Sequence, residues 1–363
     1  MIVTRLELVD FRNYVSATFT LAPGVTAVVG LNGQGKTNFA EAVAYLATLE
    51  SFRGAPDDAM VRIGANSAVV RAVIATGDGR DITVEAEINR SGRNRVLVNR
   101  QRLGRTRDLL GVVRATVFSP DDLELIKGGP GLRRRFLDDG LVSLAIKYDA
   151  MRLDLDRVLK QRNTLLKNAN GRLAGDAAFT LDVWDARLGD LGDQFGRARA
   201  VLVDRLHPMV IEAYAQLAGA ATPIEVSYRP TWRETGLVAA LAAARGDDVR
   251  RGVSTVGPHR DDLDLVINSM AARTHASQGE QRTLALALRL AAHRLVTEHT
   301  GSAPLLILDD VLSELDHDRA TALLRHLPSG QVVLTSAADL PSEAQPDAIV
   351  RITAGTVSGV EQQ

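Results

Sequence analysis

An eight-residue segment at residues 30–37, GLNGQGKT, constrains this chain more than any other stretch. A glycine is followed by four residues and then by Gly-Lys-Thr, the pattern of a loop that wraps its backbone around a polyphosphate. The apolar run Val25 to Val29 before it predicts a short buried strand, and apolar residues recur at helical spacing from Thr37 to Leu49. A strand, a glycine-rich loop and a helix in this order predict an α/β fold with a phosphate site at the loop.

Each residue type in the segment has its own task in such a site. Glycines let the backbone approach the phosphates, while consecutive N–H groups and the helix N-terminus point at their oxygens. Lys36 supplies a cation, and the Thr37 hydroxyl can ligate Mg²⁺. A glycine-rich turn that merely opens a helix is the alternative, and the flanking strand and helix argue against it. We therefore expect nucleotide contacts from Gly30, Leu31, Asn32, Gly33, Gln34, Gly35, Lys36 and Thr37.

A second polar site follows an apolar run near the end of the chain. Residues 304–308 read PLLIL, which is typical of a strand covered on both faces of a parallel sheet, and Asp309 and Asp310 come directly after it. Ligands of open α/β sheets bind at the carboxyl ends of strands. We expect Asp309 to hold Mg²⁺ and Asp310 to orient or polarise the attacking water, although such a pair could also simply end a strand and begin a turn.

The composition excludes several classes of protein. No apolar run approaches the roughly 18 residues that a transmembrane helix needs, and the opening MIVTRLELVDF lacks the pattern of a secretory signal, so we expect no membrane partner. The 363 residues include no cysteine, which excludes disulfides and thiolate zinc sites and agrees with a reducing, cytosolic compartment. Because the formal net charge is −1, any contact with nucleic acid must come from local basic patches.

Two arginine-rich segments could form such patches. Seven arginines and no acidic residue lie within residues 90–107, and a cluster of this kind would release counterions on meeting a phosphate backbone. A solvated hairpin face is an equally good interpretation. A second run, residues 133–135, is flanked by Asp138 and Asp139, so it suits internal ion pairs as well as DNA. The candidate DNA contacts are Arg93, Arg95, Arg102, Arg105, Arg133 and Arg134.

The middle of the chain predicts long helices. Within residues 144–165 and again within 181–202, apolar residues alternate at spacings of four and three, and the break between them falls at 168–176. This pattern predicts a helical hairpin whose apolar faces form a core. Further on, Ser277 and Glu280 match a capping box at the start of a long amphipathic helix, and the same helix tip would also make an anion site.

These motifs, in this order, resemble the heads of ABC-type ATPases. The set comprises the phosphate loop, the helix start SQGEQ at 277–281, the PLLILDD segment and the SELD sequence at 313–316. Further segments make the chain similar to the RecF family of DNA repair proteins over essentially its whole length. They are the opening LxxFRN, SPDD at 119–122, KGGPGLRRRFLD, GPHRDDL and DDVLSELD.

The resemblance implies a P-loop ABC-type ATPase head with a β-rich N-terminal part, built from residues 1–118 and 252–363, and an inserted, mainly helical lobe at 119–251. Residues 30–37 then correspond to the Walker A motif, 277–281 to the signature and 313–316 to the D-loop, with Asp309 as the Walker B ligand of Mg²⁺. Heads of this class bind ATP between two protomers. By resemblance, the nucleotide contacts extend to Arg12, Asn13, Ser277, Gly279 and Gln281.

The function implied by the resemblance is ATP-dependent DNA binding in recombinational repair and replication restart, linked to the SOS response and located in the cytoplasm. An ATP-sandwiched homodimer would close on single-stranded, gapped or junction DNA and act with RecR and RecO to help load the recombinase. Transport ATPases carry Glu where Asp310 stands and His where Thr335-Ser336 stands. With Lys36 and Asp310 as candidate catalytic residues, we expect a weak, DNA-stimulated ATPase whose slow hydrolysis releases the DNA.

Three other interpretations compete with this one. An ATP-binding DNA scaffold without significant turnover is favoured by the short side chain of Asp310. A transporter subunit would carry a switch histidine, a Glu base and a short helical subdomain, none of which occurs here in the expected form. A structural-maintenance head would need a long coiled-coil arm and a hinge domain, and the helical segment is too short for the arm.

Overall fold

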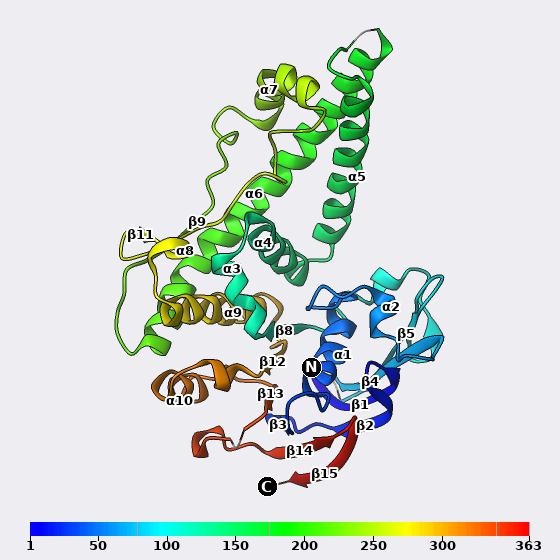
Figure 1. Ribbon diagram of the computed structural model, residues 1–363, viewed down its shortest axis with the longest axis vertical. Helices are drawn as coiled ribbons and strands as arrows, with labels where there is room; N and C mark the ends of the chain where they lie inside the picture. The colour runs from blue at the N-terminus through cyan, green and yellow to red at the C-terminus, as the bar shows by residue number, and fades with distance from the viewer. Residues whose placement is uncertain (78, 174, 339, 363) are drawn as a thin grey trace. The chain divides into compact units, whose positions relative to one another are not determined.

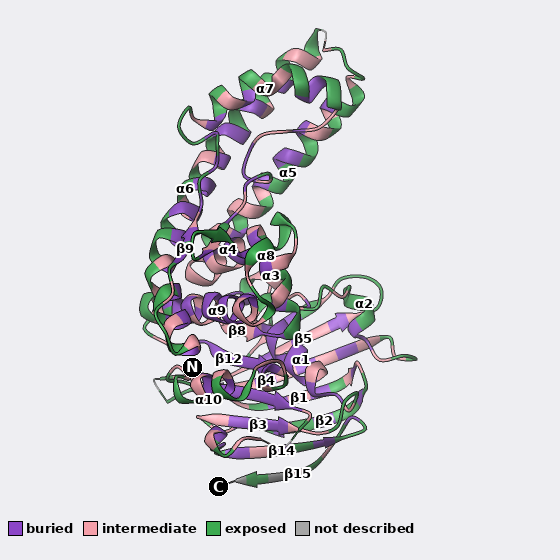
Figure 2. Cartoon of the chain, turned by 60° about the vertical axis from the view of Figure 1, so that its left-hand side comes forward, coloured by how far each residue is buried: buried purple, intermediate pink, exposed green. Residues whose placement is uncertain are grey.

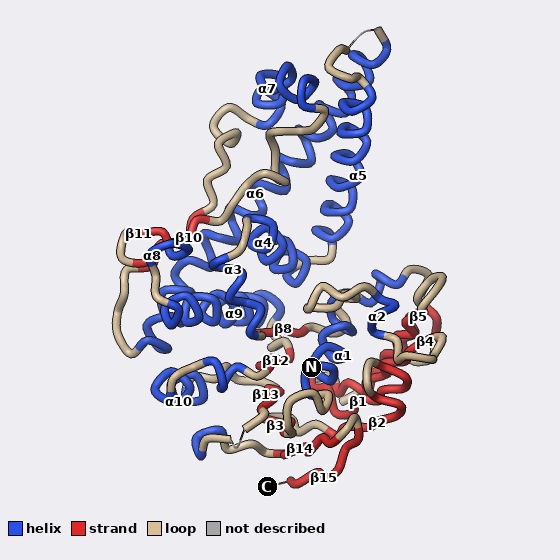
Figure 3. The backbone as a smooth tube through the Cα atoms, viewed as in Figure 1, coloured by secondary structure: helices blue, strands red, loops and turns tan. Residues whose placement is uncertain are grey.

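The computed structural model describes residues 1–363 except for 78, 174, 339 and 363. The chain forms two compact units. The first contains residues 1–123, 212–221 and 278–363, and the second contains residues 124–211 and 222–277. Residues 252–277, which the resemblance placed in the head, thus belong to the second unit, and the short segment 212–221 belongs to the first. The two large sheets lie in the first unit, and helices dominate the second (Figures 1 and 3).

A six-stranded sheet in the first unit carries both phosphate-site motifs. Its strand order is β15-β14-β3-β13-β12-β8, and all neighbours are parallel except the edge pair β14 and β15. Every residue of β12 and β13 is buried, as expected for central strands covered on both faces. Figure 2 shows β12 in the colour of buried residues. The strands are β3 (Val25–Val29), β8 (Ala115–Phe118), β12 (Leu305–Asp309), β13 (Val332–Ser336), β14 (Ala348–Thr353) and β15 (Thr356–Gln362).

A second six-stranded sheet is antiparallel and has the order β2-β1-β4-β5-β6-β7. Buried and half-buried residues alternate along β4, so one face of the sheet points into the core. The strands are β1 (Ile2–Phe11), β2 (Tyr14–Thr20), β4 (Ser67–Ala75), β5 (Asp81–Asn89), β6 (Arg95–Val98) and β7 (Gln101–Arg102). This is the β-rich N-terminal part that the sequence predicts.

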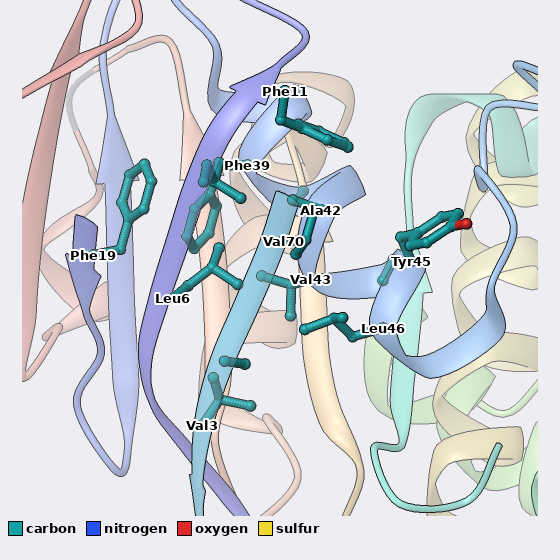
Figure 4. Packing of buried hydrophobic residues seen from close by; sticks show 14 of the residues in the cluster. Val3, Leu6, Phe11, Phe19, Phe39, Ala42, Val43, Tyr45, Leu46 and Val70 are labelled. Carbon is teal, nitrogen blue, oxygen red and sulfur yellow. The ribbon is translucent and has the colours of Figure 1, made fainter. Parts of the chain in front are cut away.

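Helix α1 (Lys36–Thr48) fills the core of the first unit. Phe39 of α1 lies against Phe19 of β2, with 4.5 Å between ring centroids, and close to Leu6 of β1 (Figure 4). Burying one such aromatic ring stabilises the fold by roughly 1.5–3 kcal/mol. The other helices of this unit are α2 (Asp57–Met60), α9 (Gln278–Thr300) and α10 (His317–Arg325), with 3-10 turns at Thr106–Leu109, Pro120–Asp122, Val311–Glu314 and Ser342–Ala344.

The second unit confirms the predicted helical hairpin. Its two arms are helix α5 (Lys147–Asn168) and residues 176–211 of the long helix α6 (Asp176–Ala218), and Leu166 and Leu181 pack together with Val249 at one end. None of the helices in the described parts of the chain combines the length and the apolar character needed to cross a membrane. The remaining elements are α3 (Leu123–Lys127), α4 (Pro130–Leu144), α7 (Leu237–Arg251), α8 (Ala272–His275) and a three-stranded sheet of β9 (Ile224–Ser227), β10 (Asp264–Ile267) and β11 (Met270–Ala271).

Candidate nucleotide site

The glycine-rich loop joins β3 to α1 at the carboxyl end of the parallel sheet, where the sequence predicts it. Gly35 caps α1 with φ 123°, and Gly33 has φ 78°, both in the region that favours glycine. A Cβ atom on Gly35 would lie 2.7 Å from the Tyr14 hydroxyl oxygen, so a side chain is also excluded there by contact. No side chain caps the N-terminus of α1, which leaves its first N–H groups directed at the loop.

Lys36 is nearly buried and holds the loop in shape. Its Nζ donates to the carbonyl oxygens of Gly30 and Leu31, at 2.8 and 3.1 Å. Burial lowers the pKa of Lys36, and the nearby carboxylates of Asp310 and Asp309 act in the opposite direction. The ammonium therefore lies against the loop carbonyls, within the electrostatic influence of the two aspartates.

Asp309 ends β12 beside the loop and has two hydroxyl partners. The hydroxyl of Thr37 donates to its Oδ1 at 3.3 Å, and the hydroxyl of Thr335 donates to the same oxygen at 2.7 Å. Burial raises the pKa of Asp309, and these hydrogen bonds oppose the rise. The two expected Mg²⁺ ligands, Thr37 and Asp309, are thus adjacent. One carboxylate and one hydroxyl suit Mg²⁺, which takes its other ligands from phosphate oxygens and water.

Asp310 has an unusual backbone conformation. Its φ of 52° and ψ of 28° place it in the left-handed region, which aspartate tolerates better than most residues. Its N–H donates to the Thr335 hydroxyl at 2.9 Å. The buried Oδ1 of its carboxyl has no hydrogen-bond partner among the described residues. An unpaired carboxylate oxygen beside a phosphate loop can orient a water molecule.

Arg12 and Asn13 form the turn between β1 and β2, and Asn13 bonds the loop. The Arg12 guanidinium makes two 2.7 Å bonds to Glu41 and a 2.8 Å bond to the Ala59 carbonyl. Because Glu41 lies fully buried on α1, Arg12 fixes the position of that helix. The Asn13 side chain donates to the Gln34 carbonyl at 2.9 Å. The structure therefore brings Asn13 to the site directly, and Arg12 through α1.

The turn between β14 and β15 also contacts the phosphate loop, which no motif in the sequence indicates. The Gly355 N–H donates to the Gln34 carbonyl at 3.0 Å, and the Ala354 N–H donates to the Gln34 side chain. A Cβ on Gly355 would lie 2.6 Å from the Asn13 carbonyl oxygen. Gln34 is thus bonded to protein on both its backbone and its side chain, and it supports the loop.

The expected signature segment leads into α9. Arg319, which the sequence analysis did not include in the site, lies next to it. Gly279 and Gln281 are on the first turns of α9, while Ser277 precedes the helix and belongs to the second unit. A Cβ on Gly279 would lie 3.1 Å from Nη1 of Arg319. Arg319 in turn pairs with Asp316, which caps α10 and lies in the expected D-loop segment. Arg319 therefore lies between this segment and the first turn of α9.

The arginines expected to contact DNA differ in exposure and in whether they are bonded to other protein groups. Arg93, Arg102 and Arg105 are exposed and have no ion-pair partner in the described part of the chain, whereas Arg95 lies 3.5 Å from Glu87. Arg133 is buried and bonds both carboxylate oxygens of Asp262, at 2.6 and 2.8 Å. Arg134 is half-buried and donates to the Asp261 carbonyl; burial, and then Arg199, lower its pKa.

A phosphate loop next to a strand-end carboxylate on a largely parallel sheet defines the class of P-loop ATPase heads. Comparison with known proteins narrows the class. The family described as "RecF/RecN/SMC N terminal domain" matches residues 2–357. The "DNA replication and repair protein RecF" of Streptomyces avermitilis is 45% identical over 352 residues, covering 93% of this chain and 94% of that protein. Its counterpart in Frankia alni is 46% identical over 364 residues and covers 94% and 96%.

Solved structures with a similar fold include a RecF protein and an Smc head. The structure of "the recombination mediator protein RecF-ATP in RecFOR pathway" superposes with a TM-score of 0.89 at 29% identity, covering 100% of this chain and 97% of that one. An Smc head bound to the C-terminal winged-helix domain of ScpA shares the fold at a TM-score of 0.62 and 17% identity, covering 100% and 98%. This chain belongs to the RecF family. The fold class predicted from the sequence is confirmed.

Proposed function

We propose that this chain binds ATP and Mg²⁺ and, in the ATP-bound form, binds DNA as a homodimer in recombinational repair and replication restart. Membership of a family of DNA replication and repair proteins supports the cellular role, and the relative solved with ATP supports the nucleotide. The observation that carries the proposal is the Thr37 hydroxyl, 3.3 Å from Oδ1 of Asp309 at the edge of the glycine-rich loop. A phosphate-bound Mg²⁺ requires this pairing.

The roles of the site residues follow from their contacts. Lys36 would exchange its bonds to the Gly30 and Leu31 carbonyls for phosphate oxygens, because an ammonium gains more from a charged acceptor. The loop N–H groups would bind the remaining oxygens. Mg²⁺, when bound, would supply charge neutralisation on the phosphates through Thr37 and Asp309. Asp310 would hold the attacking water through its unpaired Oδ1.

Slow hydrolysis is the second part of the proposal. Asp310 is one methylene shorter than the glutamate of transport ATPases. The shorter side chain limits the reach of its carboxyl toward a water molecule. ATP would then act as a clamp whose lifetime sets the residence time on DNA. The same observation favours the alternative of an ATP-binding DNA scaffold without significant turnover.

The dimer and its partners complete the proposal. In the dimer, Ser277, Gly279 and Gln281 of one copy would face the triphosphate held by the loop of the other. The exposed Arg93, Arg102 and Arg105 would contribute to a DNA surface, with single-stranded, gapped or junction DNA as ligand. RecR and RecO are proposed as partners because the RecF family suggests them, and the cytoplasm as the location. Since Arg133 serves internal ion pairs, we do not assign it to DNA.

Analytical ultracentrifugation with ADP, with ATP and with ATP plus gapped duplex tests these points together. We expect a monomer with ADP and a dimer with ATP, and Lys36→Ala should abolish the ATP-dependent dimer while Lys160→Ala, an exposed lysine of α5, keeps it. A wild-type chain that stays monomeric with ATP would contradict the dimer.

Phosphate release with and without gapped DNA separates the clamp from the scaffold. We expect slow release that DNA accelerates, whereas a scaffold would release none under either condition. Turnover well above about one per second without DNA, the lower end of ordinary enzyme rates, would contradict the clamp.

A further inference from the structure

Thr335 lies at the carboxyl end of β13, directly opposite Asp309 in the parallel register of β12 and β13. Its side chain is fully buried, with 0% of the residue exposed. The hydroxyl donates to Oδ1 of Asp309 at 2.7 Å and accepts the N–H of Asp310 at 2.9 Å. A single hydroxyl thus uses its proton on the first aspartate and a lone pair on the second.

These two bonds restrain the carboxylate of Asp309 and the backbone of Asp310, the two aspartates of the proposed site. Asp309 Oδ1 also receives the Thr37 hydroxyl, which Mg²⁺ would recruit as a ligand, so Thr335 is the partner that keeps the carboxylate oriented once Mg²⁺ is bound. Asp310 occupies the left-handed region, and a backbone held there persists only where its surroundings fix it. The bond from its N–H to Thr335 is such a restraint.

We propose that Thr335 is a positioning residue for the nucleotide site, acting through both aspartates. It orients Asp309 for Mg²⁺ and holds Asp310 in the backbone conformation that places its carboxyl beside the loop. In transport ATPases a histidine stands near this place in the chain, whereas the Thr335 hydroxyl is directed at the aspartates. The inference rests on the proposed nucleotide function and names a residue that supports it.

The test compares Thr335→Val, which keeps the shape and removes the hydroxyl, with Thr335→Ser, which keeps the hydroxyl. Binding of a fluorescent ATP analogue is measured as a function of Mg²⁺ concentration, together with kcat and KM for ATP. Residues that orient a metal ligand typically contribute 10–100-fold to metal affinity or activity. For valine we therefore expect the half-maximal Mg²⁺ concentration to rise, and kcat to fall, by about tenfold or more.

The controls separate this inference from the function on which it rests. Analogue binding in EDTA should not change in Thr335→Val, and Thr335→Ser should stay close to wild type in all measurements. Thr321→Val removes a buried hydroxyl that has no partner among the described residues, and it should leave the Mg²⁺ dependence unchanged. If circular dichroism shows that the Thr335→Val variant does not fold, the comparison is made between Thr335→Ala and Thr335→Ser.

Two outcomes would overturn the role of Thr335. One is a wild-type Mg²⁺ dependence in the variants that lack the hydroxyl. The other is a serine variant as defective as valine, since the hydroxyl would then not be the determinant. A wild-type chain that binds no nucleotide with Mg²⁺ would instead contradict the proposed function.

Discussion

His293 is a single buried group that should make the stability of the first unit depend on pH. It lies on α9 with 1% of its surface exposed, and its Nδ1 is 3.3 Å from the Thr116 hydroxyl of β8. Its Nε2 is buried and has no partner among the described residues. Burial lowers the pKa of His293 to about 4, because the charged ring would lose its hydrating water.

We expect this histidine to destabilise the first unit in mild acid. The unfolded chain binds the proton with an ordinary pKa near 6.5, so stability is fully present above about pH 6.5. It falls as the pH decreases toward 4 and then levels off, and the full change amounts to about 3 kcal/mol. Urea unfolding of the wild type and of His293→Met across this pH range measures it. An equally steep loss in the methionine variant would show that other groups are responsible.

The residues of the site differ in how readily the sequence reveals them. Gly30 to Thr37 share one short segment, so their placement between a strand and a helix was predictable. The place of Asp309 at the end of a strand was predictable too, because a fully apolar run precedes it. Thr335 lies 26 residues from Asp309 and meets it only through strand pairing, and Gly355 reaches Gln34 through a turn at the other end of the chain. Such contacts depend on register, which a single sequence leaves open.

At the scale of elements, one glutamine joins the two large sheets. The Gln331 amide donates to the carbonyls of Val3 and Ala22, at 2.7 and 2.8 Å, and its oxygen accepts the Val3 N–H at 2.8 Å. Gln331 is 3% exposed and immediately precedes β13, while Val3 is in β1 of the antiparallel sheet. The parallel sheet and the β-rich part are therefore linked by polar bonds as well as by the apolar core around α1.

Replacing Gln331 by methionine should weaken this link. The change keeps the length of the side chain and removes the bonds to two buried backbone groups of Val3 and the part-buried carbonyl of Ala22; leaving a buried group unpaired costs roughly 1–3 kcal/mol. We expect the free energy of unfolding to fall by at least about 2 kcal/mol, and hydrogen exchange to accelerate at the Val3 amide. Gln101→Met, at an exposed glutamine of β7, is the matched control. Unchanged exchange at Val3 would show that the apolar core alone holds the sheets together.

At the scale of the whole molecule, each unit is assembled from separate parts of the chain. The apolar periodicity of α5 and α6 predicted the helical hairpin, because buried faces repeat along a helix. The return of residues 212–221 to the first unit was not predictable, since it occurs inside one continuous helix. The net charge of −1 does not reveal local clusters of charge. Exposed arginines gather around β7, at one edge of the antiparallel sheet.

Removing arginines from this edge should weaken DNA binding in a salt-dependent way. For Arg102→Ala with Arg105→Ala, we expect a lower affinity and a smaller slope of log K against log salt, by about 0.9 for each duplex phosphate that the variant no longer neutralises. Titrations of gapped duplex at several salt concentrations, with ATP present, provide the slope. Arg157→Ala with Arg250→Ala removes two exposed arginines of α5 and α7 as a charge-matched control. Equal slopes for both variant pairs would contradict a DNA contact at the β7 edge and support its interpretation as a solvated face.

The left-handed backbone of Asp310 also bears on how this site could be re-engineered. Aspartate is among the few residues that accept this conformation readily, and glutamate is not. A designer who installs glutamate to lengthen the acidic side chain would gain a methylene of reach but work against the main chain. The main chain thus favours the shorter acid here, and a longer acid at this position would require reshaping the loop together with the side chain.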